Sequence, residues 1–110
     1  MYKQGTVVLT PFPFTDPSGD KVRPAIIVSS NLKGTDVIVV FITSKKKNAG
    51  MHTVAIAPTD SNGLKTPSMA VCSKIATLDK KVILGELGVL SESDKKAVQK
   101  ALAAVFGFGS

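Results

Sequence analysis

The sequence predicts a mainly β domain, a small antiparallel β-barrel with one helix at its C-terminal end. Short apolar runs rich in β-branched residues recur along most of the chain. Clusters of Pro, Gly, Asn and Asp separate these runs, as turns separate the strands of a small barrel. Helical spacing of apolar residues appears near the C-terminus. With 110 residues, of which 44% are apolar, we expect a single domain over residues 1–110.

The N-terminal part predicts a strand, then a loop, then a second strand. We expect the first strand over Thr6–Leu9. Pro11–Phe14 cannot be helical, because each proline lacks an N–H and restrains the residue before it. Asp16–Asp20 is composed of turn formers. Arg23-Pro24 then leads out of this loop into a strand over Ala25–Ser29 that looks buried on both faces. An arginine in this place is held more firmly than a typical surface arginine.

The middle of the chain contains the strongest strand signal. Asp36–Ile42 is a continuous apolar run, so we expect this strand at the centre of the sheet. A basic loop, Lys45–Gly50, follows it. Further strands are predicted over His52–Ala57, Ser68–Ile75 and, more briefly, Val82–Leu84.

Three connections complete the β part. Pro58–Gly63 is rich in turn formers and predicts a loop. Thr77–Lys80 is expected to be a turn. Gly85 and Gly88 flank two residues and suggest a bend.

The last segment predicts a helix of roughly 14 residues. Ser91 is placed to cap its N-terminus, with Asp94 at the position of a capping-box acid. Gly107 is a good stop. The expected apolar stripe consists of Ala97, Val98, Ala101, Leu102, Val105 and Phe106. The residues expected to face away from it are Lys95, Lys96, Gln99 and Lys100.

Composition restricts the classes of function. Residues 1–81 hold 11 Lys and Arg against 5 Asp and Glu, so the net charge of +6 belongs to this part of the chain. Such a surplus suits a polyanionic partner such as nucleic acid or an acidic protein segment, although it also serves simple solubility. Cys72 is the single cysteine, which excludes an internal disulfide and a cysteine-based metal site. We expect a reducing, cytoplasmic setting, with no membrane span and no signal peptide.

Arg23 and Thr43 are the best candidates for chemistry. With one His and one Cys, no metal-ligand spacing is present, and no phosphate-binding glycine loop precedes a helix. Arginine presents a planar fork of donors that fits phosphate oxygens. If the second and third strands pair, both residues come to one rim of the barrel. Alternatively, Arg23 pairs with an aspartate and holds a loop, and Thr43 is an ordinary strand-end residue.

Other residues are candidates for contacts to a nucleic acid. Lys45, Lys46 and Lys47 can bind phosphates, or they form a solvated turn. Phe12 and Phe14 can stack on bases, although a core or interface position is the commoner use of such residues. His52 is a candidate general acid or base, because histidine is the usual proton carrier at neutral pH, although a lone histidine at the start of a strand is more often only a satisfied polar residue.

Several segments together resemble the MazF/PemK (Kid) family of toxins. The N-terminal match is Gly5–Leu9, then Pro11–Asp16, then Arg23-Pro24-Ala25. It continues in Phe41–Ser44 and in Ser73–Lys80, and it extends through Gly88 and Leu90-Ser91 to the final helix. Kid-type members carry an arginine and an aspartate at positions that here hold Val71 and Ser73. The chain therefore follows the MazF pattern.

The resemblance implies a toxin of a type II toxin–antitoxin pair with an SH3-like barrel. Such toxins are cytoplasmic homodimers that cleave single-stranded RNA at short sequences, without metal or cofactor. Arg23 matches the family arginine and Thr43 the family threonine. The 2′-hydroxyl attacks the scissile phosphate, which leaves a 2′,3′-cyclic phosphate and a 5′-hydroxyl. The RNA-binding residues expected on this basis are Phe14, Thr15, Asp16, Lys21, Ser44, Lys45, Lys46, Lys47, Ser73 and Thr77.

The family also implies an acidic antitoxin whose disordered tail folds over the site, and through which the complex binds DNA. Two other classes of function stay open on the sequence alone. One is a toxin that binds DNA gyrase, as CcdB does. The other is a non-catalytic SH3-like barrel that binds RNA or an acidic peptide. A gyrase poison does not need the Arg23 and Thr43 pair, so that pair favours the nuclease.

Overall fold

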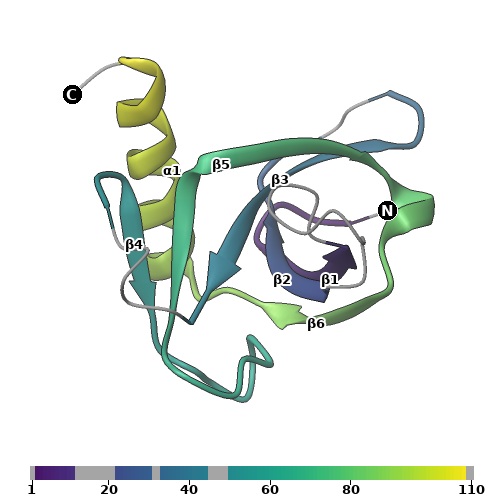
Figure 1. Cartoon of the computed structure of the whole chain (residues 1–110), viewed down its shortest axis with the longest axis horizontal. Coiled ribbons are helices and arrows are strands. Elements are labelled where there is room, and N and C mark those ends of the chain that lie inside the picture. The colour runs from purple at the N-terminus through teal and green to yellow at the C-terminus, as the bar shows by residue number, and fades with distance from the viewer. Residues whose placement is uncertain (1, 12–21, 31–32, 45–49, 109–110) are drawn as a thin grey trace.

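Six antiparallel strands form one strongly curled sheet, and a single helix packs against it (Figure 1). The computed structural model describes residues 2–11, 22–30, 33–44 and 50–108. The elements are β1 (Thr6–Pro11), β2 (Val22–Ile27), β3 (Asp36–Thr43), β4 (Thr53–Ile56), β5 (Ser68–Asp79), the 3-10 turn η2 (Lys80–Val82), β6 (Gly85–Val89) and α1 (Glu92–Phe106). The mainly β class with a C-terminal helix is thus confirmed.

The strand order is β4-β5-β3-β2-β1-β6. β3 lies between β2 and β5, as its continuous apolar run predicts. Its residues alternate between two buried clusters, because successive side chains of a strand point to opposite faces. Val40 and Ile42 belong to the cluster that α1 covers, and Val37, Val39 and Phe41 belong to the cluster on the other face.

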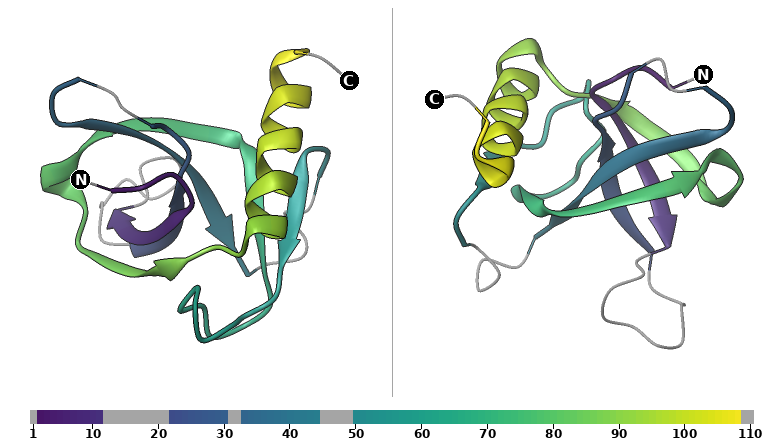
Figure 2. Two further views of the ribbon diagram at one scale, coloured as in Figure 1. Left: turned by 180° about the vertical axis from the view of Figure 1, so that it is seen from behind. Right: turned by 90° about the horizontal axis from the view of Figure 1, so that it is seen from above.

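The helix covers one side of the sheet next to β4 and β5, which both views of Figure 2 show. Val98 is buried, with Ala101, Leu102 and Val105 packed around it. Phe106 was expected in this stripe, but it is 56% exposed and stacks on Phe108 at 5.8 Å. The last turn extends beyond the sheet residues that the earlier turns cover (Figure 2).

The predicted limits of the helix are confirmed. The Ser91 side chain accepts a hydrogen bond from the Asp94 backbone N–H at 3.1 Å. Gly107 adopts a left-handed conformation, φ 73°, and its N–H donates to the backbone carbonyls of Ala103 and Ala104 in the last turn. Lys95 was expected to face away from the core. Instead its aliphatic stem lies against Gly5, which leaves the ammonium free to reach Glu92.

Three predictions between Thr77 and Gly88 are wrong. β5 continues through Thr77 to Asp79, so the expected turn is strand, and Val82–Leu84 is not a strand. The sixth strand is β6, where the glycines suggested a bend. Gly88 lies so close to the 59–64 loop that a Cβ atom would clash with the Ser61 carbonyl oxygen. A glycine within a strand often marks such a close approach of another backbone.

Arg23-Pro24 lies inside β2 and not in the loop before it. Pro24 pairs with Leu9 of β1, and the ladder to β3 begins one residue later, at Ala25. Proline is tolerated there because the missing N–H falls just outside the β2–β3 ladder. Among the described helices, none is long and apolar enough to cross a membrane.

Candidate functional site

Pairing of β2 with β3 brings Arg23 and Thr43 to the same end of the sheet. The register pairs Ala25 with Phe41, and the same spacing carried two residues further sets Arg23 opposite Thr43. On the other side of β2, Arg23 is paired with Thr10 of β1. Residues at paired positions of neighbouring strands share one face of the sheet. Thr10, Arg23 and Thr43 therefore form a row across three strands.

Arg23 and Thr43 line one pocket of about 330 Å³. Its described lining contains two cationic residues, four residues with hydroxyl groups and no carboxylate. An arginine and a lysine around one hollow, with hydroxyls between them, make a site for an anion with several oxygens. The lining residues are Leu9, Arg23, Pro24, Ile42, Thr43, Ser44, Gly63, Leu64, Lys65, Thr66, Ser68 and Leu87.

One wall of this pocket is a loop that a buried asparagine holds in shape. The side-chain oxygen of Asn62, Oδ1, accepts hydrogen bonds from the backbone N–H groups of Thr59 and Leu64, at 3.0 and 2.9 Å. The side-chain nitrogen, Nδ2, donates to the Ala57 backbone carbonyl at 2.9 Å. Asn62 is 1% exposed, so these bonds replace water around the whole side chain. The wall is therefore well ordered before any ligand arrives.

The same loop is fastened to β6. The Val89 N–H donates to the Ser61 carbonyl at 2.8 Å. Gly63 has φ +72° and leaves no room for a Cβ beside the Leu87 carbonyl. Sequence reasoning identified this segment only as a loop, and it missed Lys65, Thr66 and Ser68 as pocket residues. The Asn62-Gly63 dipeptide followed by Lys65 was the available signal, since this dipeptide fixes a tight turn.

Ser44 joins Arg23 and Thr43 at the pocket, but three other candidates do not line it. His52 precedes β4, whose far end, Ile56, pairs with Ser68 of the pocket. At about 3.3 Å per residue, His52 therefore lies roughly 13 Å along the strand from that end. Its left-handed backbone, φ 67°, forms the turn into β4, and its carbonyl accepts from the Cys72 N–H.

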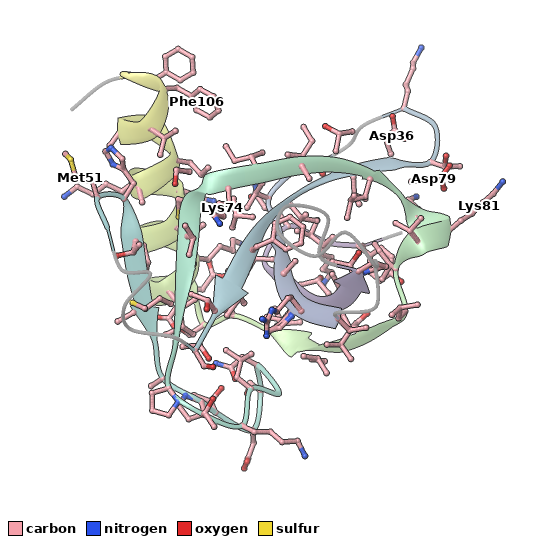
Figure 3. The ribbon with its side chains drawn as sticks, viewed as in Figure 1. Asp36, Met51, Lys74, Asp79, Lys81 and Phe106 are labelled. Atoms are coloured by element: carbon pink, nitrogen blue, oxygen red, sulfur yellow. The ribbon has the colours of Figure 1, made fainter. Side chains whose placement is uncertain are left out.

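Figure 3 shows Met51, the residue before His52, on the side of the molecule where α1 lies. Ser73 and Thr77 are exposed on β5, outside the pocket. Ser73 stands at the bulge where the β3–β5 register shifts. The remaining candidates lie outside the described residues: Phe14, Thr15, Asp16, Lys21, Lys45, Lys46 and Lys47.

The described residues contain no group of three or more His, Cys, Asp or Glu side chains placed to hold a metal ion. Cys72 is fully buried next to α1, and burial raises the pKa of its thiol to about 11. A thiol that stays protonated is a poor nucleophile. Its surroundings identify Cys72 as a core residue.

Comparison with known proteins identifies the family. A sequence model of the "PemK-like, MazF-like toxin of type II toxin-antitoxin system" matches residues 3–106. A probable endoribonuclease MazF of Mycolicibacterium smegmatis is 28% identical over 89 residues, which span 79% of this chain and 82% of the relative.

Solved structures share the fold. A mycobacterial endoribonuclease in complex with its cognate antitoxin superposes with a TM-score of 0.81 at 23% identity, covering 100% of this chain and 99% of the other. MazF from Deinococcus radiodurans gives 0.76 at 18% identity, with 97% of each chain covered. At these identities the likeness describes the fold, and the curled six-stranded sheet with its C-terminal helix is the architecture these toxins share.

Proposed function

Because the chain belongs to the family of PemK-like, MazF-like toxins of type II toxin–antitoxin systems, we propose that it is an endoribonuclease that cleaves single-stranded RNA within short sequences. The observation that carries this proposal is the meeting of Arg23 and Thr43 at one cationic, hydroxyl-lined pocket. The curated relative named as a probable endoribonuclease supports it.

The proposed reaction needs no metal. The RNA 2′-hydroxyl attacks the adjacent phosphorus and gives up its proton, and the P–O5′ bond breaks as the 5′ oxygen takes up a proton. The products are a 2′,3′-cyclic phosphate and a 5′-hydroxyl. Negative charge grows on the two non-bridging oxygens in the transition state, and fixed donors can stabilise it as a metal ion would.

Arg23 is the donor for this charge. Its guanidinium stays protonated at ordinary pH, so it acts as an electrostatic stabiliser and not as a base. Thr43 holds the phosphate or the 2′-hydroxyl in line through its own hydroxyl. Lys65, which also lines the pocket, extends the cationic surface for the flanking phosphates of the strand.

The biological setting follows from the family. We propose that the protein works as a cytoplasmic homodimer and that a cognate acidic antitoxin inhibits it. The mycobacterial neighbour was solved with its cognate antitoxin. A pocket that binds RNA phosphates through Arg23 and Lys65 also suits carboxylates of an acidic tail that folds on binding.

The test is cleavage of a long single-stranded RNA by purified protein in EDTA, with mapping of the ends. We expect cutting at a short motif that leaves 5′-hydroxyl ends. Arg23→Ala should lower the rate by about 10²- to 10³-fold, as removal of one transition-state donor typically does. Lys100→Ala removes the same charge from the exposed face of α1 and should cut at the normal rate. Intact RNA after treatment with folded dimer would refute the nuclease.

A further inference from the structure

Thr10 carries a buried hydroxyl for which the described part of the chain provides no hydrogen-bond partner. The residue is 0% exposed, and its Oγ1 atom has no hydrogen-bond partner among the described residues. Burial of a hydroxyl without a partner costs free energy, and most buried polar atoms in native structures avoid it. The isosteric valine would fill the same space without that cost. An unpartnered hydroxyl at a buried position therefore calls for an explanation outside the packing of the sheet.

The register supplies that explanation. Thr10 is paired with Arg23, so the two side chains stand on one face of adjacent strands. The preceding residue on this face of β1 is Val8, and the next on this face of β2 is Ala25, both fully buried and apolar. Thr10 departs from this apolar pattern at the one position of β1 that stands beside the arginine.

Thr10 itself is not among the residues that line the pocket. A hydroxyl that does not line the pocket can act on a ligand only through a neighbour that does, and here that neighbour is Arg23. The guanidinium has several N–H donors in a rigid fork, so it can bond a hydroxyl and a phosphate at the same time. A bond on one edge of the fork also fixes the direction in which the other edge points.

We propose that Thr10 is a positioning residue for Arg23, whose hydroxyl accepts a hydrogen bond from the guanidinium when Arg23 engages an RNA phosphate. This inference rests on the proposed function, because it assigns Arg23 to the phosphate. The cost of the unpartnered hydroxyl in the free protein is then recovered in the complex. Thr10 does not touch the substrate.

Three variants test the proposal. Thr10→Val keeps the shape and removes the hydroxyl, and Thr10→Ser keeps the hydroxyl. Thr6→Val is the matched control, since Thr6 is also buried on β1, 3% exposed, but is paired with Val89 and not with Arg23. Thermal unfolding, RNA cleavage and binding of an oligonucleotide with 2′-deoxy residues, which cannot be cleaved by this route, are measured for each.

We expect Thr10→Val to raise Tm by a few degrees, because it removes the unpartnered hydroxyl. Its kcat should fall about tenfold, the usual scale for a lost hydrogen bond to a charged group. Its affinity for the 2′-deoxy oligonucleotide should fall about threefold. Thr10→Ser and Thr6→Val should keep wild-type activity and affinity. In an Arg23→Ala background, Thr10→Val should change neither kcat nor affinity.

A Thr10→Val enzyme with wild-type kcat and affinity would overturn the proposal, as would equal losses with and without Arg23. The two proposals fail separately. If the wild-type protein cuts no RNA, the proposed nuclease activity is refuted, and affinity for the 2′-deoxy oligonucleotide then tests the role of Thr10. If Thr10→Val weakens this binding only when Arg23 is present, the positioning role is supported. If Thr10→Val leaves the binding unchanged, the positioning role is rejected.

Discussion

Cationic side chains lie at both ends of the central strand β3, yet the two ends differ in shape and in charge balance. At the Thr43 end, Arg23 and Lys65 line a pocket whose described lining has no carboxylate. At the Asp36 end, Asp36 is paired with Asp79, and the lysines of η2 follow directly. Figure 3 shows Asp36, Asp79 and Lys81 together at this edge, far from Met51 and the helix.

The Asp36 end is organised by internal hydrogen bonds. The Asp79 carboxylate accepts from the Lys81 backbone N–H at 2.9 Å and from the Thr35 hydroxyl at 3.2 Å. It therefore caps the 3-10 turn that joins β5 to β6. Positive charge alone does not mark a binding site in this protein. What distinguishes the Thr43 end is the combination of cations and hydroxyls around a hollow.

The largest expected effect comes from disturbing the wall of the Thr43 end. Gly88→Ala would place a Cβ atom in a steric clash with the Ser61 carbonyl oxygen, so the 59–64 loop has to move away from β6. We expect a loss of about 3 kcal/mol of stability, the upper range for overpacking, together with weaker RNA cleavage. Urea unfolding measures the first and the RNA assay the second. Gly85→Ala on the same strand has open space around it and should change little; equal losses in both variants would contradict this account of the wall.

Exchanges between arginine and lysine test whether the shape of the cation matters at the Thr43 end of β3 and not at the Asp36 end. Arg23→Lys keeps the charge but loses the fork that contacts two phosphate oxygens, so cleavage should fall about 10- to 100-fold. Lys81→Arg at the Asp36 end should leave the rate unchanged. The measurement is the initial rate of RNA cleavage at fixed ionic strength. A fully active Arg23→Lys enzyme would show that a point charge is enough.

A smaller effect is expected from Lys65. Lys65→Ala should weaken binding of single-stranded RNA a few-fold and reduce the slope of log K against log salt by about 0.7, the value for one phosphate contact. Lys80→Ala removes the same charge from the Asp36 end and should leave the slope as it is. Binding is measured by titration at several salt concentrations. Equal changes of slope would mean that both ends contact RNA.

The smallest effect concerns Asp79 and appears only in acid. The backbone N–H of Lys81 holds the pKa of the Asp79 carboxyl below its ordinary value of 3.8, and the Thr35 hydroxyl and the η2 lysines lower it further. A carboxyl with a lowered folded-state pKa stabilises the fold above its unfolded pKa, and this contribution is lost as the pH falls through the folded pKa. Wild-type Tm should thus drop below about pH 4 more steeply than that of Asp79→Asn. RNA cleavage at neutral pH should be equal in the two proteins.

Sequence reasoning reached the fold class because its signals are local. Alternating or continuous apolar runs identify strands such as β3, and Ser91 and Gly107 mark the limits of the helix by their own hydrogen-bonding and backbone preferences. It also selected Arg23 and Thr43 as candidates, from the residue types and the family resemblance. Their roles in catalysis stay predictions, to be decided by the variants above.

Other features follow from contacts between distant segments, which no local pattern encodes. β6 includes Gly88 because the 59–64 loop lies against this residue and leaves no space for a side chain there. Lys65 becomes a pocket residue because Asn62 and β6 hold its loop in place, and His52 is kept away by the length of β4. Thr10 is an ordinary strand threonine until the register sets it beside Arg23. The sequence by itself determined which elements form and which residues carry groups suited to the proposed chemistry. The tertiary structure decided which of these residues lie together, because strand register and loop packing depend on the whole sheet.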